Sequence, residues 1–158
     1  HSHIRGHIRF KEIDNDLVEV KVRLKGLEPG FHGFHIHEAG DTRDKCNGAC
    51  KHFNPFGTFH GGPNSSIRHV GDLGNIRANK DGIVKDKFTD HMIKLRGELS
   101  IIGRSVVIHE DIDDLGQGGI DKYGVVTDMD KRKESLKTGN AGKRIACGVI
   151  GYHRKMFQ

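Results

Sequence analysis

The sequence predicts an all-β fold, and two features of the chain carry that prediction. In residues 17–24, aliphatic side chains at positions 18, 20, 22 and 24 alternate with charged ones at 19, 21 and 23, which is typical of a strand with one buried face. The chain also has 22 glycines and few long apolar runs, which favours turns and short strands over helices. Its 158 residues suit one domain. We therefore expect a single all-β domain that covers residues 1–158.

The strands expected along the chain follow from similar patterns. They cover residues 4–10, 17–24, 31–38, 83–90, 92–99, 104–109 and 145–152. Asn79 to Gly82 predicts a turn, because Gly82 can adopt a positive φ. Two long segments without periodicity, residues 39–73 and 110–144, interrupt the strands. Loops of this length in a compact domain are usually functional or disordered, and the histidines in and beside them favour function.

Composition narrows the classes of partner. No stretch approaches the roughly 18 apolar residues that cross a membrane, and no signal peptide is visible. The net charge of +5 and the pI of about 9.2 would permit nucleic-acid binding. However, basic residues alternate with acidic ones, as in Lys85-Asp86-Lys87, and no nucleic-acid motif occurs. We expect neither nucleic acid nor membrane as a partner, and a positive surface that attracts a small anion.

His35 and His37 are the most informative residues of the chain. Alternate side chains of a strand point to opposite faces, so these two imidazoles share one face while Phe34 and Ile36 share the other. An isolated His-x-His is often two surface histidines. Here further nitrogen and oxygen ligands follow in or beside the long loops, namely His52, His60, His69, Asp72 and His109. Since imidazole binds copper and zinc well, the sequence predicts one compact metal centre.

Three cysteines are too few for a scaffold built on disulfides. Cys46 and Cys50 have the spacing C-x3-C, which alone could indicate a pair of zinc ligands. The spacing therefore leaves the role of the cysteines open.

Six motifs together resemble one protein family, that of copper/zinc superoxide dismutase, over residues 4–152. They are Gly30-Phe-His-Gly-Phe-His-Ile-His37, His52-Phe-Asn-Pro55, Arg68-His-Val-Gly-Asp-Leu-Gly-Asn75, Asp113-Asp-Leu-Gly116, Lys137-Thr-Gly-Asn-Ala-Gly142 and Ala146-Cys-Gly-Val-Ile-Gly151. The resemblance implies a flattened eight-stranded Greek-key β-barrel, an immunoglobulin-like sandwich with two long functional loops. Residues 4–10 correspond to the second strand of the family, so the first strand is expected to be absent from this chain and to leave an open edge.

The resemblance also implies the metals and their ligands. Copper is assigned to His35, His37, His52 and His109, and zinc to His52, His60, His69 and Asp72. His52 belongs to both sets and would bridge the metals. Asp113 is expected to hydrogen-bond one histidine of each set, and His32 to make a structural hydrogen bond without binding metal. His1, His3, His7, His91 and His153 have no motif support and are expected to be ordinary histidines.

Other family positions concern the substrate and the disulfide. Arg144 matches the arginine that docks the anion, since a guanidinium stays charged and can bind two oxygens, and Thr138 is expected to narrow the channel beside it. Cys46 is expected to pair with Cys147, which leaves Cys50 as a free thiol.

The implied activity is dismutation of superoxide to dioxygen and hydrogen peroxide, with copper alternating between Cu(II) and Cu(I). The catalytic residues would be Arg144 and His52. The alternatives are a catalytically inactive dismutase-like protein, acting in copper handling or as a decoy, and a metal-storage protein. The resemblance further implies a homodimer through Gly148 to Gly151, with Ala39 reducing the contact area, a cytoplasmic location and a copper-delivery chaperone as a partner.

Residues 120–136 make this chain roughly a dozen residues longer than typical relatives. We expect Lys131, Arg132 and Lys133 to add to superoxide attraction. Tyr123, Val125 and Val126 are expected to anchor the insertion.

Overall fold

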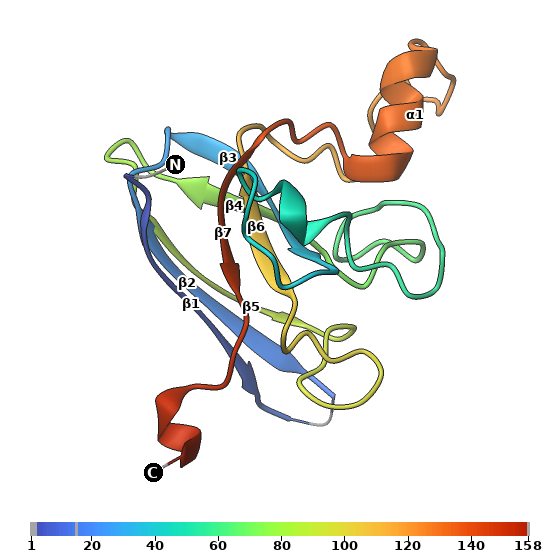
Figure 1. Cartoon of the computed structure of the whole chain (residues 1–158). Helices are drawn as coiled ribbons and strands as arrows, with labels where there is room; N and C mark the ends of the chain where they lie inside the picture. Colours follow the sequence, from blue (N-terminus) through green and yellow to red (C-terminus); the bar gives the residue numbers. More distant parts are fainter. Residues whose placement is uncertain (1–2, 15, 158) are drawn as a thin grey trace.

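Seven strands form two antiparallel sheets in the computed structural model, which describes residues 3–14 and 16–157 (Figure 1). The sheet order β1-β2-β5 joins Arg5–Glu12, Val18–Lys25 and Val84–Asp90, and the order β4-β3-β6-β7 joins Asp72–Ala78, Gly30–His37, Ser105–His109 and Arg144–Val149. Because the chain crosses repeatedly between the sheets, the arrangement is the expected Greek-key sandwich. The described residues include no helix both long and apolar enough to cross a membrane.

The core lies between the two sheets, where alternation along the strands directs the apolar side chains. Val18, Val20 and Val22 of β2 are buried, as are Phe34 and Ile36 of β3. Phe34 also meets Phe88 of β5 edge to face, with ring centroids 6.2 Å apart. The inward face of β3 is thus fixed by packing. Its outward face, which carries the histidines, is therefore fixed as well.

One predicted strand is absent, and one strand was not predicted. Residues 92–99 form no strand, because the Asp90 carboxylate accepts hydrogen bonds from the backbone N–H groups of Met92 and Ile93, both at 3.0 Å. Those donors are then not available to a sheet. Conversely, β4 was not predicted. It contains Gly74 at φ 81° and begins at a candidate metal ligand, Asp72, so it lacks simple alternation.

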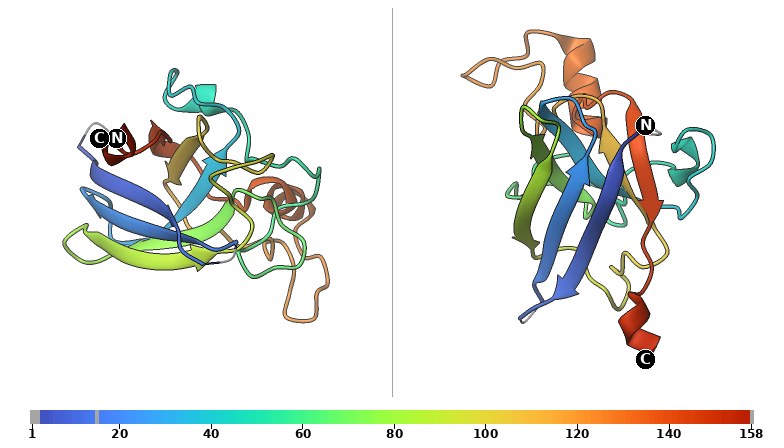
Figure 2. Two further views of the ribbon diagram at one scale, coloured as in Figure 1. Left: turned by 90° about the horizontal axis from the view of Figure 1, so that it is seen from below. Right: turned by 90° about the vertical axis from the view of Figure 1, so that its left-hand side faces the viewer.

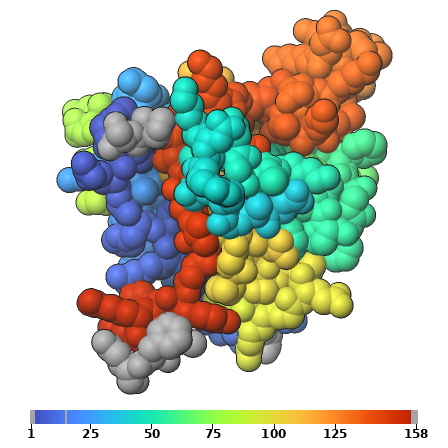
Figure 3. Space-filling model, in the orientation of Figure 1, coloured from blue at the N-terminus to red at the C-terminus, as the bar shows by residue number. Residues whose placement is uncertain are grey.

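The second long loop contains an unexpected helix, α1, at Met129–Thr138. The Asp128 side chain caps its N-terminus by accepting a hydrogen bond from the Lys131 backbone N–H at 3.0 Å. Gly139, at φ 81°, ends the helix in the left-handed conformation. Figure 3 shows this segment, in orange, projecting from the body of the molecule.

One side of the sandwich is open, as expected. Within the described chain, β1 pairs with β2 alone and β7 pairs with β6 alone. The expected turn is also present, since Asn79 accepts hydrogen bonds from Asp81 and Ile83 and Gly82 has φ 75°. A short 3₁₀ helix at Asn47–Ala49 and another at Arg154–Phe157 complete the elements.

Candidate metal centre

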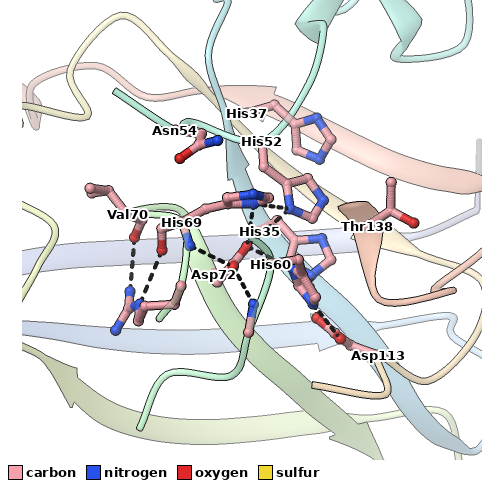
Figure 4. Close-up of polar contacts among 12 residues, drawn as sticks. His35, His37, His52, Asn54, His60, His69, Val70, Asp72, Asp113 and Thr138 are labelled. Atoms are coloured by element: carbon pink, nitrogen blue, oxygen red, sulfur yellow. Dashed lines mark hydrogen bonds and ion pairs between the residues drawn. The ribbon is translucent and has the colours of Figure 1, made fainter. Parts of the chain in front are cut away.

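The outward face of β3 brings the first candidate ligands together. His35 and His37 are both buried, with exposed fractions of 0% and 1%. His109, at the end of the neighbouring strand β6, places its Nε2 atom 3.4 Å from His37 Nε2. His52 reaches the same group from the first long loop through a bridge to His37, and its ring centroid lies 4.1 Å from that of His35 (Figure 4). Four imidazoles thus surround one point.

A second group shares His52 with the first. Nitrogen atoms of three histidines surround Asp72 Oδ1, with Nδ1 of His52 and of His60 at 3.0 Å and Nδ1 of His69 at 3.2 Å. A tetrahedron with metal–ligand bonds of about 2.0–2.1 Å has edges of about 3.3 Å. The atoms of this set are therefore spaced almost as zinc requires, and one carboxylate with three imidazoles is a donor set that zinc accepts.

The ligand atoms within each group lie within 4.8 Å of one another. The structure therefore brings together all seven residues expected to bind metal, in the two expected sets, with His52 common to both. Copper and zinc themselves fit because imidazole suits both ions.

Asp113 connects the two groups. Its Oδ2 atom lies 2.6 Å from His35 Nε2 and its Oδ1 atom lies 2.8 Å from His60 Nε2. These contacts leave Nδ1 of each ring pointing into its group. Among the described residues, His35 Nδ1 and His60 Nδ1 are the buried side-chain polar atoms that make no hydrogen bond, although His60 Nδ1 lies 3.0 Å from Asp72 Oδ1. Since buried polar groups are rarely left unpaired, both nitrogens are positioned as ligands.

Backbone carbonyls orient other rings. His37 Nδ1 lies 2.9 Å from the Cys50 carbonyl oxygen and His109 Nδ1 lies 3.1 Å from that of Gly142. Contacts of this kind fix ring orientation and tautomer in metal sites. His32 lies outside both groups, between the carbonyl oxygens of His109 and Glu28 at 2.8 and 2.7 Å, so its predicted structural role is confirmed.

Burial also sets the charge of the ligands. It lowers the pKa of His37 to about 2 and that of His109 to about 4, and the positive charge of Arg144 contributes to both shifts. Both imidazoles are neutral at neutral pH, which is the form that binds metal. Burial alone would raise the pKa of Asp72, but the imidazoles of His52, His60 and His69 around its carboxylate hold that pKa well below its ordinary value.

Arg144 stands at the start of β7 beside the first group. Its guanidinium is half-buried and donates a hydrogen bond from Nη1 to the Cys46 carbonyl oxygen at 2.9 Å. Cys46 forms a disulfide with Cys147, and Cys50 is a free, exposed thiol, as expected. The disulfide therefore holds the carbonyl that positions Arg144. Thr138 lies at the end of α1, where its hydroxyl donates to Glu134 Oε1 at 2.7 Å.

Comparisons with known proteins agree with this geometry. A family model described as copper/zinc superoxide dismutase matches residues 4–150. The chain belongs to the copper/zinc superoxide dismutase family. It is 56% identical over 155 residues to a superoxide dismutase of Paramecium bursaria Chlorella virus 1, covering 98% of this chain and 76% of that one.

A second curated relative and a solved structure are also similar to the chain. It is 50% identical to superoxide dismutase A of Xenopus laevis, over 94% of this chain and 90% of the relative. A solved structure of the clock protein EA4 superposes with a TM-score of 0.83 at 44% identity, over 94% of this chain and 87% of that one.

The sequence did not indicate a role for Arg68. In this dismutase its side chain holds the backbone of the loop that carries the candidate ligand His69. Its guanidinium donates to the carbonyls of His69 and Val70, at 3.0 and 2.8 Å, and to Asp90 Oδ1 at 2.8 Å. Both ion-pair side chains are almost fully buried. The signals in the sequence were its place at the start of a family motif and its position next to the candidate ligand His69.

The expected anchors of the inserted segment were wrong. Tyr123, Val125 and Val126 are exposed by 78%, 59% and 43%. Ile120 and Val126 form an isolated antiparallel bridge, and the chain turns between them at residues 122–124, so these side chains do not pack into the dismutase core.

Polar groups anchor the segment instead. Arg132 donates to the Gly116 carbonyl oxygen at 2.6 Å, and Ser135 Oγ donates to Asp114 Oδ1 at 2.7 Å. Because Asp114 directly follows Asp113, α1 is tied to the turn that carries the carboxylate joining the two ligand groups.

Proposed function

We propose that the protein catalyses the dismutation of superoxide, 2 O₂⁻ + 2 H⁺ → O₂ + H₂O₂. The observation that carries this proposal is the pair of buried ligand groups that share His52 beside the half-buried Arg144. A metal-storage protein would need no docked cation at its site. An inactive homologue would be expected to have lost a ligand or the arginine. This chain keeps the ligands and the arginine together.

Bound copper would supply the one-electron chemistry, while zinc, which has no redox chemistry, would fix the loop. We assign copper to His35, His37, His52 and His109, and zinc to His52, His60, His69 and Asp72. Because His52 Nδ1 lies against Asp72, its Nε2 faces the copper group. We infer that His52 holds a proton at Nε2 in one half of the cycle and releases it toward peroxide in the other.

Arg144 is positioned to bind the superoxide substrate. Its guanidinium carries a permanent positive charge and can bind both oxygens of a diatomic anion, while its bond to Cys46 keeps it beside the copper ligands. The chain's net charge of +5 further favours encounter with superoxide.

Metal content and activity measured on one sample test this proposal. We expect one copper and one zinc per chain, rapid superoxide consumption, loss of activity when copper is removed and recovery when it is restored. The variant Arg144→Ala should keep both metals but react at least about tenfold more slowly. Arg43→Ala, which removes an exposed cation paired with Asp41 in the loop after β3, should keep the parent rate. A fully metallated parent with only background activity would overturn the proposal.

We further propose a homodimer in which β7 contributes apolar contact area. Val149 is 53% exposed at the end of that strand. Light scattering should give about twice the chain mass of 17.6 kDa at micromolar concentration. A mass near that of one chain would rule the dimer out.

The cytoplasmic location and a copper-delivery chaperone stay predictions. Relatives of this chain include dismutases named as extracellular. Fractionation of the cells that make the protein tests the location, and metal loading with and without a chaperone tests the partner.

A further inference from the structure

The outward face of the β1-β2-β5 sheet gathers positive charge on the side of the molecule opposite the metal loops (Figure 1). Its positions alternate with the buried residues of β2 and their partners across the sheet. We call this surface the basic sheet face; it consists of Arg5, His7, Arg9, Lys11, Glu19, Lys21, Arg23, Lys25, Lys85, Lys87 and Thr89. Eight of these eleven residues are lysine or arginine, and one is acidic.

The strand register places like charges directly opposite one another. Arg9 and Lys87 flank Lys21 in one row, and Arg5 pairs with Lys25 in another. Like charges in such positions destabilise a sheet. None of the eight cations forms an ion pair with any residue that the structure describes. Glu19 lies opposite Lys11 at one end of the face. In the other rows no ion pair with a described residue offsets the repulsion, which points to an anionic partner.

Because side chains along a strand point alternately outward and inward, the positive charge of this face is not apparent in the linear sequence. In Lys85-Asp86-Lys87, both lysines point outward, whereas Asp86 pairs with the buried Val22 and belongs to the inner face. Acidic and basic residues that are mixed along the chain are thus separated in space. The expectation of scattered charge does not hold for this sheet.

The size of the face limits what can bind. Strands lie about 4.8 Å apart, and alternate residues of one strand lie about 6.7 Å apart. Three strands and four rows therefore give a strip about 10 Å wide and about 20 Å long. The right-hand view of Figure 2 looks onto these three strands. A strip of this shape matches a thin, linear polyanion.

The types of side chain on the face indicate which class of polyanion it can bind. Phe10 and Phe88 pair with inward positions, so the face offers no aromatic platform for unpaired bases. It has no large apolar side chain to insert into a lipid surface, and no helix projects from it into a nucleic-acid groove. What remains is charge alone. We propose that the basic sheet face binds a linear sulfated polysaccharide.

Binding of a defined heparin oligosaccharide to the metal-loaded protein tests the proposal. The variant Arg9→Thr/Lys21→Thr/Lys87→Thr removes the central row and keeps residues that favour strands. We expect it to bind at least about tenfold more weakly at about 0.1 M salt, with a shallower dependence of affinity on salt. Its thermal stability should match or exceed that of the parent, since like-charge repulsion is removed.

The matched control is Lys80→Thr/Lys122→Thr/Lys155→Thr, which removes three exposed cations from other parts of the surface. It should bind within about twofold of the parent, because net charge changes equally but the face is intact. Equal weakening in both variants would overturn the proposal, as would no binding to the parent. Tighter binding to a DNA duplex, single-stranded DNA or phosphatidylserine vesicles than to heparin would also overturn it and would reassign the face to that class.

Discussion

The Asp113 side chain, which belongs to neither ligand group, contacts a ligand from each of them, through His35 and His60. An asparagine there keeps the size of the side chain but can accept from only one of the two rings. We expect Asp113→Asn to weaken zinc binding by about 10–100-fold, as outer-sphere substitutions do in other metal sites.

Competition with a chromophoric zinc chelator measures this change. The neighbouring variant Asp111→Asn removes the same charge from an exposed side chain and should bind zinc as the parent does. Equal zinc affinity of Asp113→Asn and the parent would show that the two contacts do not support the site.

Five of the seven ligand residues stand in short motifs, and period-two alternation places His35 and His37 on one face. His60 and His109 stand outside these motifs, in the first long loop and at the end of an apolar strand. The contacts of Asp113 were expected only through the family resemblance. The hydrogen bonds from Arg68 to Asp90 and from Ser135 to Asp114 were not predictable from the sequence. Each joins segments that only the folded chain brings together.

At the scale of elements, the disulfide between Cys46 and Cys147 closes a loop with a sequence separation of 101. Restricting the unfolded chain over such a loop stabilises the native state by about 4 kcal/mol in the entropy model. Cys147→Ser should lower the free energy of unfolding by about that amount in urea titrations. Cys50→Ser, which removes the free thiol, should leave stability unchanged. If the two variants unfold alike, the disulfide contributes no stability.

The inserted segment offers a test of electrostatic guidance. The Arg132 guanidinium donates a hydrogen bond to the Gly116 carbonyl oxygen and has a structural role, so Arg132 is left unchanged in the variant that tests guidance. Lys131→Gln/Lys133→Gln removes two exposed charges, and we expect a lower rate at low ionic strength and a flatter salt dependence, since the Debye length is about 10 Å at 0.1 M. Stopped-flow superoxide decay measures both. An unchanged rate and salt slope would mean that these lysines do not guide the substrate.

The same elements show where prediction from sequence fails. Alternation found β2 and β3, but it also suggested a strand at 92–99, where Asp90 instead captures the backbone donors. The caps of α1 were visible as Asp128 and Gly139. They were overlooked because the helix lies inside a long segment without clear periodicity.

For the whole molecule, burial of neutral histidines makes stability depend on pH. The folded pKa values of His37 and His109 are lowered to about 2 and about 4, whereas the unfolded value is about 6.5. At these two histidines the unfolded chain therefore binds more protons below about pH 6.5, so their contribution to stability is full above that pH and falls as pH drops toward about 4. Two such groups give up to about 2.7 kcal/mol per pH unit.

Urea unfolding of the metal-free protein between about pH 7 and about pH 4.5 checks this slope. The variant His37→Gln/His109→Gln should show a shallower decline, because fewer buried groups must take up protons. A parent whose stability is constant over this range would contradict the account.

The basic sheet face shows why the distribution of charge over the whole molecule could not be predicted from the sequence. Its charges lie on three strands that are distant along the chain, and only the register of β1, β2 and β5 places them in common rows. The open side of the sandwich, in contrast, was expected from the family resemblance.

The central claim is that one histidine joins two metal sites. A crystal structure of the metal-loaded protein, with anomalous scattering recorded at the copper and zinc edges, tests it most directly. We predict one copper peak among His35, His37, His52 and His109, and one zinc peak among His52, His60, His69 and Asp72, with a different ring nitrogen of His52 on each metal. A single metal position, or a His52 ring bound to only one metal in the Cu(II) state, would contradict the account.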